Sequence, residues 1–115
     1  MLALGLEEKM QDDLIFNENG DTLTAFVGCE VDHHTARRIR EDIDNKMFLS
    51  KPRTLVLDFF GVRFMDSSGI GLILGRAETA STIGAKIEIK GASPTLMKIL
   101  HLSGVDKVKN IKIIR

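Results

Sequence analysis

The feature that most constrains the fold is the nearly continuous apolar segment Thr54–Phe59, with the sequence TLVLDF. A strand with one solvated face alternates apolar and polar residues, whereas a continuous apolar run is typical of a strand buried on both faces. We therefore expect this strand to be central in a sheet, with helices above and below it. Leu55, Val56 and Leu57 should be almost inaccessible to solvent.

Four further segments are predicted to be strands. Leu14–Phe16 and Thr22–Val27 are separated by Asn, Gly and Asp residues, a pattern that predicts a β-hairpin. Lys86–Lys90 alternates charged and apolar residues, which is typical of a strand with one solvated face. Lys109–Ile114 predicts a short closing strand.

Between the hairpin and the apolar strand, the hydrophobic pattern changes to that of an amphipathic helix. Apolar residues recur at spacings of three and four, at Ala36, Ile39, Ile43 and Met47. Such a stripe predicts a helix that packs one face against the sheet. Asp32 precedes the stripe, where its carboxylate could cap the first turn of the helix.

Two more helices are expected later in the chain. The first extends from about Ser67 to Ile83 and ends at Gly84. Its inward-facing residues are predicted to be Ile70, Ile73, Leu74, Ala77 and Ala80. The second begins at Ser93-Pro94, a capping serine followed by a proline at the first helical position, and ends at Gly104.

The element order β-β-α-β-α-β-α-β predicts a single α/β domain, residues 14–115, with helices packed against a small mixed sheet. A chain of 115 residues has room for one such domain. Residues 1–13 are expected to form an N-terminal arm or a short helix. The single cysteine, Cys29, cannot form an internal disulfide, and we expect a small buried thiol in a cytoplasmic protein.

Composition argues against several classes of partner. Sixteen basic and sixteen acidic residues give zero net charge, and the absence of Trp and Tyr disfavours a stacking nucleic-acid surface. The apolar stretch Ile70–Leu74, which Gly71 interrupts, is far too short to span a bilayer. His33 and His34 would point about 100° apart on a helix, so we expect two surface residues rather than a shared metal site. We therefore expect no nucleic acid, membrane, metal or cofactor.

Met65–Arg76, with the sequence MDSSGIGLILGR, is the least ordinary segment of the chain. Gly69, Gly71 and Gly75 fall inside a helical pattern, where each glycine costs up to about 1 kcal/mol relative to alanine. Gly71 and Gly75 lie four residues apart on one helix face. That face is either a bare groove beside the helix N-terminus or a region of close packing on the sheet.

Three chemical interpretations of this segment compete. A dinucleotide-binding loop needs its glycines directly after a strand, but residues 60–68 intervene here. A serine nucleophile needs a GxSxG elbow, which the sequence around Ser67 and Ser68 lacks. A hydroxyl at a helix N-terminus can instead accept a phosphate, whose charge the positive end of the helix would stabilise. Asp66, alongside, would add negative charge to such a site.

Three segments read together resemble a known family. They are EVDHHTA at Glu30–Ala36, MDSSGIGLILGR at Met65–Arg76, and GASPTLMKILHLSGVDKV at Gly91–Val108. In this order and spacing they are similar to the bacterial anti-sigma factor antagonists of the STAS fold, and most similar to those of sporulation. The resemblance covers about Leu14–Ile114, nearly the whole chain.

The resemblance implies a protein–protein switch and not an enzyme. The unphosphorylated antagonist would bind an anti-sigma factor with serine kinase activity and release the sigma factor. The kinase would then phosphorylate Ser67 and end the binding, and a separate serine phosphatase would restore it.

The resemblance also implies which residues form the site, with no catalytic residue among them. Ser67 is expected to be the phosphorylation site. The expected partner-binding residues are Asp32, Asp66, Ser67, Ser68, Gly69 and Gly71. The alternative is a STAS module that is not phosphorylated and acts as a scaffold or ligand sensor in a stress-signalling complex.

Overall fold

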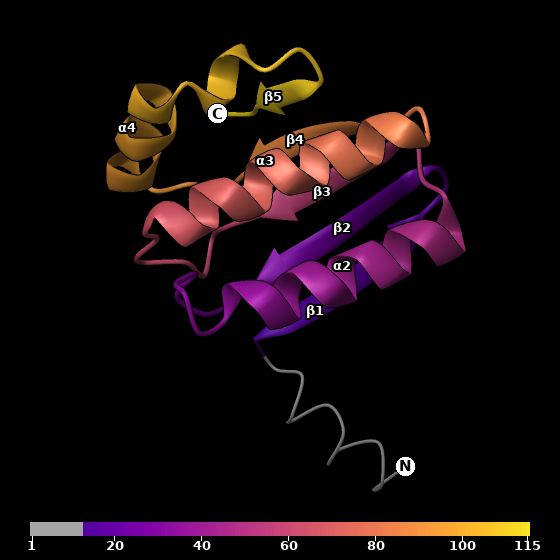
Figure 1. Cartoon of the computed structure of the whole chain (residues 1–115), viewed down its shortest axis with the longest axis horizontal. Helices are drawn as coiled ribbons and strands as arrows, with labels where there is room; N and C mark the ends of the chain where they lie inside the picture. Colours follow the sequence, from indigo (N-terminus) through magenta and orange to yellow (C-terminus); the bar gives the residue numbers. More distant parts are fainter. Residues whose placement is uncertain (1–12) are drawn as a thin grey trace, which may run out of the picture.

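The computed structural model describes residues 13–115, so the predicted N-terminal arm lies almost entirely outside the described residues. The strands are β1 (Leu14–Asn19), β2 (Thr22–Val27), β3 (Thr54–Asp58), β4 (Lys86–Lys90) and β5 (Ile111–Ile113). The helices are α2 (Ala36–Ser50), α3 (Ser67–Thr82) and α4 (Pro94–Ser103), and the 3₁₀-helix η1 (Val105–Lys107) follows α4 (Figure 1). The predicted order of elements is confirmed.

The five strands form one mixed sheet in the order β1-β2-β3-β4-β5. β1 and β2 pair antiparallel through a turn in which Gly20 has a φ of 62°, a conformation that favours glycine. The pairs β2–β3, β3–β4 and β4–β5 are parallel, so β3 lies in the centre of the sheet. The predicted hairpin, followed by parallel strands joined through helices, is therefore confirmed.

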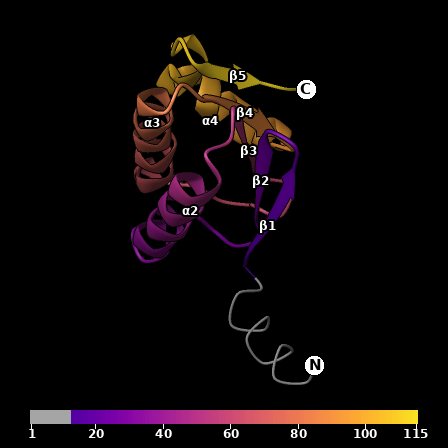
Figure 2. The ribbon, with the colours of Figure 1, turned by 90° about the vertical axis from the view of Figure 1, so that its right-hand side faces the viewer.

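The two long helices cover the same face of the sheet. Figure 2 shows α2 and α3 beside one another on one side of the strands, and in Figure 1 α4 lies beyond the end of β4. Helices on both faces of β3 were expected, and this expectation is wrong for α2 and α3. No helix within residues 13–115 is both long enough and apolar enough to cross a bilayer.

Burial of the central strand nevertheless agrees with the sequence. Leu55, Val56 and Leu57 are 0%, 7% and 0% exposed, respectively. Val56 points away from α2 and α3, but its register neighbours Thr24 and Glu88 flank it in the adjacent strands. The central position of β3, rather than a second helical layer, therefore accounts for the continuous apolar run.

The buried face of α2 is the predicted one, because Ile39, Ile43 and Met47 are fully inaccessible. The buried residues of α3 are Gly69, Leu72, Ile73, Arg76, Ala77 and Ala80. Leu74 was predicted to face inward, but it is 41% exposed. The predicted and observed stripes share Ile73, Ala77 and Ala80, but the observed one also contains Gly69 and Arg76, which an apolar pattern does not reveal.

The ends of α4 agree with the sequence. The Ser93 hydroxyl accepts a hydrogen bond of 3.1 Å from the backbone N–H of Leu96, and Pro94 occupies the first helical position. Gly104 ends the helix with a φ of 84°. Leu96 and Leu100 are buried and pack into the common core.

Candidate functional site

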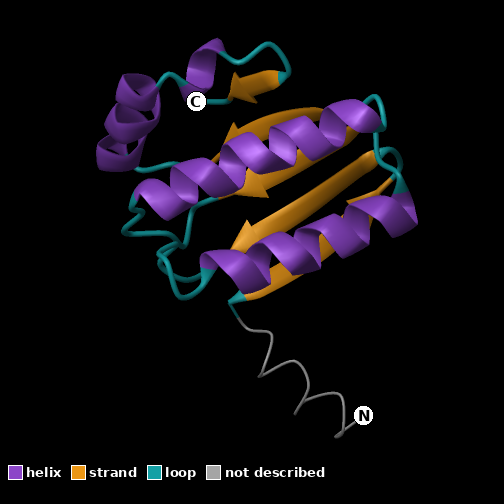
Figure 3. Ribbon diagram, in the orientation of Figure 1, coloured by secondary structure: helices purple, strands orange, loops and turns teal. Residues whose placement is uncertain are grey.

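Two loops far apart in the sequence are joined at one end of the sheet. Val31 and Met65 form an isolated parallel β-bridge between the loops that precede α2 and α3. The backbone N–H of Val31 donates to the Phe64 carbonyl at 3.1 Å, and the N–H of Asp66 donates to the Val31 carbonyl at 3.2 Å. These bonds place the Asp32 loop next to the start of α3, where Figure 3 shows the two loops meeting.

Asp66 caps the N-terminus of α3. Its backbone is extended (φ −99°, ψ −166°), and its Oδ1 accepts a hydrogen bond of 2.7 Å from the N–H of Ser68. Ser67 is the first residue of the helix and is exposed, whereas Ser68 is half-buried. Within residues 13–115, no hydrogen bond involves the Ser67 hydroxyl. The first-turn N–H groups give this end of the helix a partial positive charge that favours anions.

Asp32 stabilises a turn that precedes α2. Its Oδ1 accepts hydrogen bonds from the N–H groups of His34 (2.9 Å) and Thr35 (3.1 Å). The Thr35 hydroxyl accepts from the N–H of Asp32 and donates to the Glu30 carbonyl. The helix begins only at Ala36, with Thr35 as its N-cap, so it starts later than predicted. The bonds from Thr35 and His34 hold the pKa of Asp32 below its ordinary value.

His33 and His34 lie on the surface, as predicted, but in the turn before α2 and not on the helix itself. Both are exposed, and their rings meet edge to face with centroids 5.8 Å apart. Among residues 13–115, no group of three or more His, Cys, Asp and Glu side chains has an arrangement that could hold a metal ion.

The three glycines of α3 have different surroundings. A Cβ on Gly69 would lie 2.0 Å from Cγ of the buried Met65, so close packing excludes a side chain there. A Cβ on Gly71 or Gly75 would have no heavy atom within 4 Å. Close packing on the sheet is therefore wrong as an explanation for Gly71 and Gly75, and these positions leave the helix surface open.

An open pocket of about 550 Å³ lies between the first turns of α2 and α3. We call it the basic pocket, and its lining residues are His33, His34, Ala36, Arg37, Arg40, Ser68, Gly71 and Leu72. The sequence analysis assigned no role to Arg37 and Arg40, because charged residues on an amphipathic helix usually just face the solvent. The available signal was the density of basic and imidazole groups in HHTARRIR.

A buried ion pair joins the two helices further along. Arg76 of α3 is 5% exposed, and its Nε lies 2.8 Å from Oδ1 of Asp44 in α2. Burial lowers the pKa of the Arg76 guanidinium, and the Asp44 carboxylate opposes that shift. Arg76 belongs to the MDSSGIGLILGR segment, but the sequence alone gave it no role.

Cys29 is a free thiol and is half-buried, so the predicted burial is only partial. Burial raises its pKa, and the nearby charge of Asp13 raises it further. A thiol with a raised pKa is a poor nucleophile near neutral pH.

The structure thus brings together most of the predicted site residues. Asp32, Asp66, Ser67, Ser68 and Gly71 lie where the two loops and the first turn of α3 meet. Gly69 is different because it is buried against Met65 and contributes no surface.

Comparison with known proteins agrees with this architecture. Residues 14–113 match the family model of the STAS domain. The chain is 36% identical over 85 residues to the anti-sigma F factor antagonist of Lysinibacillus sphaericus, a match that covers 74% of this chain and 73% of that protein.

Two solved structures are similar over nearly the full length. The anti-sigma factor antagonist SpoIIAA in its unphosphorylated form has a TM-score of 0.69 and 25% identity, covering 89% of this chain and 87% of that one. The Bacillus cell fate determinant SpoIIAA in the phosphorylated form has a TM-score of 0.67 and 27% identity, covering 89% and 91%. Fold and site together define a small mixed α/β module with an exposed serine at a helix N-terminus. The chain belongs to the STAS domain family.

Proposed function

We propose that the chain is an anti-sigma factor antagonist controlled by phosphorylation. In the unphosphorylated state it binds an anti-sigma factor with serine kinase activity and so frees a sigma factor in the cytoplasm. Phosphorylation of Ser67 ends the binding, and a serine phosphatase restores it. The chain itself catalyses nothing. The name of the Lysinibacillus relative supports this proposal, as do the two phosphorylation states in which SpoIIAA has been solved.

The exposure of Ser67 is the observation that carries the proposal. Ser67 is exposed at the start of α3, and the Asp66 carboxylate already satisfies the N–H of Ser68. Ser68 is half-buried and lines the basic pocket, so its hydroxyl is less accessible to a kinase. Ser67 is therefore the better acceptor of the two serines.

Phosphorylation should change the surface while preserving the fold. A phosphate on Ser67 would lie at a helix N-terminus, where backbone N–H groups and the helix dipole favour anions. The cost then falls on the complex, because a dianion placed against a surface that fits a neutral hydroxyl must be desolvated. Every 1.4 kcal/mol of that cost weakens binding about tenfold.

The proposed partner-binding surface surrounds Ser67. It comprises Asp32, held in its turn by His34 and Thr35, together with Asp66, Ser68 and Gly71. Gly69 is buried and does not contact the partner itself. It supports this surface, because its missing side chain lets Met65 pack under the first turn of α3.

The test is incubation with the cognate anti-sigma factor kinase and ATP, followed by phosphopeptide mapping and binding measurements. Ser67→Ala should bind the kinase and accept no phosphate, and Ser67→Asp should bind weakly. Ser68→Ala is the matched control and should still accept phosphate. Phosphate on Ser68, or tight binding by Ser67→Asp, would contradict the proposal. Tight binding with no phosphate on any serine would support the scaffold alternative instead.

A further inference from the structure

We propose that the basic pocket between α2 and α3 receives an acidic segment of the anti-sigma factor. This inference rests on the proposed function and adds the chemistry of the partner surface. It is drawn from the charges that line the pocket, from the groups that neutralise them, and from the continuation of the pocket along the α2–α3 groove.

The pocket carries positive charge that its neighbours neutralise only in part. The side chains of Arg37 and Arg40 are 80% and 48% exposed. Both face the same carboxylate oxygen, Oε2 of Glu41, at 3.5 Å from Arg37 Nε and 3.9 Å from Arg40 Nη2. Within residues 13–115, two guanidinium groups thus share one carboxylate, and one positive charge is left over.

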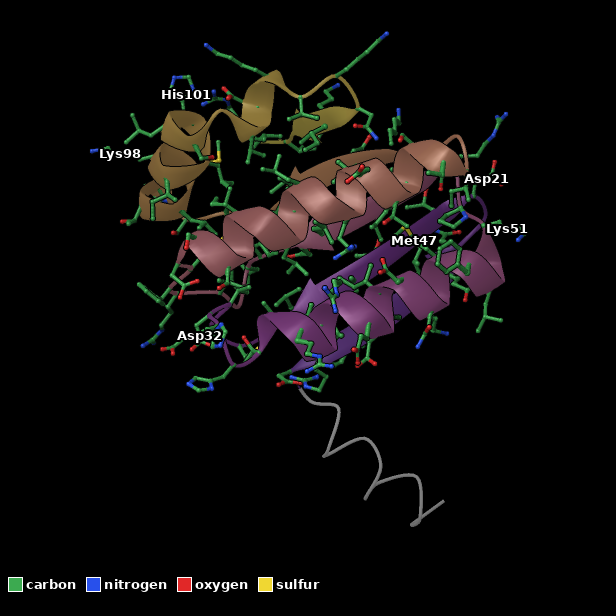
Figure 4. The ribbon with its side chains drawn as sticks, in the orientation of Figure 1. Asp21, Asp32, Met47, Lys51, Lys98 and His101 are labelled. Atoms are coloured by element: carbon green, nitrogen blue, oxygen red, sulfur yellow. The ribbon has the colours of Figure 1, made fainter. Side chains whose placement is uncertain are left out.

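The acidic residues at the same end of the groove are engaged by their own loops. Oδ1 of Asp32 accepts two backbone hydrogen bonds, and Oδ1 of Asp66 accepts the bond from the N–H of Ser68. Figure 4 shows Asp32 at the loop before α2, beyond the first turn of that helix. These hydrogen bonds come from neutral N–H groups and leave both carboxylates charged, but they hold the two carboxylates at the loops. The exposed positive charge over α2 itself is therefore that of Arg37 and Arg40.

A second depression of about 550 Å³ extends the groove beyond Arg40, which lines both depressions. Its other lining residues are Glu41, Asp44, Asn45, Phe48 and Arg76. The Nη1 atom of Arg76 is buried and has no hydrogen-bond partner among the described residues. Buried polar groups are normally hydrogen-bonded, so this N–H group at the base of the groove lacks an acceptor, although the Asp44 carboxylate balances the charge of Arg76.

A carboxylate is the partner group that fits these features. Arginine pairs with carboxylates through two parallel hydrogen bonds, and such charge-assisted bonds are stronger than neutral ones. The groove extends from the Ser68 end to Phe48, so an extended segment with acidic side chains can follow it. Complementary charge would also accelerate association with the partner.

This arrangement links the pocket to the phosphorylation switch. Ser67 directly precedes Ser68, which lines the pocket. A phosphate on Ser67 carries a charge of about −1.5 to −2 and would lie beside the site of the acidic segment. It would repel that segment and compete with it for the arginine side chains.

Charge reversal tests the proposal with the full chain and the cognate anti-sigma factor. The double variant Arg37→Glu/Arg40→Glu is compared with Lys98→Glu/Lys109→Glu, which makes the same change in net charge elsewhere. Lys98 lies on α4, away from the groove (Figure 4). Dissociation constants are measured by calorimetry at several salt concentrations, and thermal melting verifies that each variant is folded.

The arginine variant should bind at least about tenfold more weakly than the parent, with a shallower salt dependence, and the lysine variant should bind like the parent. Parent-like affinity and salt dependence in the arginine variant would overturn the role of the pocket and leave the proposed function intact. An equal loss in both variants would also overturn it, because total charge would then be responsible. A parent protein that binds no anti-sigma factor would overturn both proposals.

Discussion

Nε of Arg76 in α3 lies 2.8 Å from Oδ1 of Asp44 in α2, and this ion pair joins the two helices that carry the candidate site. The Arg76 side chain is 6% exposed and that of Asp44 is 25% exposed. The pair is therefore removed from most of the solvent that would weaken a surface salt bridge. It fixes the spacing of α2 and α3 beside the groove.

Removing the carboxylate of this pair should destabilise the fold. Asp44→Ala leaves the Arg76 charge buried without its partner, so the free energy of unfolding should fall by about 1–3 kcal/mol. The double variant Asp44→Ala/Arg76→Met removes both charges and should recover part of that loss. Urea denaturation measures both effects. Parent-like stability of Asp44→Ala, or a double variant no more stable than the single one, would contradict the prediction.

Asp66 should contribute separately to helix stability and to partner binding. Asp66→Ala removes the cap on Ser68 and should cost about 0.5–2 kcal/mol of unfolding free energy. Asp66→Asn keeps a capping oxygen and should be nearly as stable as the parent. Both variants remove the negative charge of the Asp66 side chain next to Ser67, so both should bind the partner more weakly.

Ser93→Ala is the matched control, because Ser93 caps α4 in the same way by accepting from the N–H of Leu96. It should lose a similar stability in thermal melting and keep full partner binding. A binding loss in Ser93→Ala as large as that in Asp66→Ala would show that reduced stability alone weakens the complex.

The glycines of α3 should respond to alanine in opposite ways. Gly71→Ala and Gly75→Ala meet no neighbouring atom, so each should raise the free energy of unfolding by about 0.4–1 kcal/mol. Gly69→Ala forces its Cβ against the buried Met65 and should cost about 1–3 kcal/mol. Chemical denaturation of the three variants provides the comparison.

Partner binding separates the two stabilised variants. Gly71 lines the basic pocket, so its new methyl group should weaken partner binding, whereas Gly75→Ala should bind like the parent. A Gly71→Ala protein with increased stability and unchanged binding would show that the bare surface has no role in recognition.

The turn at Asp32 should make the stability of the fold depend on pH, and the sign of that dependence follows from the pKa of Asp32. Hydrogen bonds from Thr35 and His34 hold the folded-state pKa of Asp32 below the ordinary 3.8. The stabilisation is therefore complete above the ordinary value and is lost as the pH falls through the lower, folded-state value. Carbon-detected NMR titration of Asp32 should find a pKa below 3.8. Thr35→Ala removes only the weaker hydroxyl contact and keeps the backbone N–H, so it should raise this pKa only slightly. A pKa at or above the ordinary value in the parent would contradict this description of the turn.

The sequence by itself determined the features that depend on residues close to one another along the chain. The order of strands and helices, the Ser93–Pro94 start of α4 and the Gly104 end all follow from local propensity and capping. Burial of Leu55 and Leu57 followed from the apolar run, because so few polar groups interrupt it. The motif residues Asp66 and Ser67 were also located correctly at the start of α3.

Only the tertiary structure decided which distant groups meet. The bridge between Val31 and Met65, which joins the two site loops, depends on backbone hydrogen bonds that no side-chain pattern records. The buried face of α3 could not be chosen from apolar spacing, because a charge such as Arg76 enters the interior only when a partner from another helix, here Asp44, compensates it. Placement of α2 and α3 on one face likewise depends on how the whole chain packs, which is why the basic pocket between them emerged only from the fold.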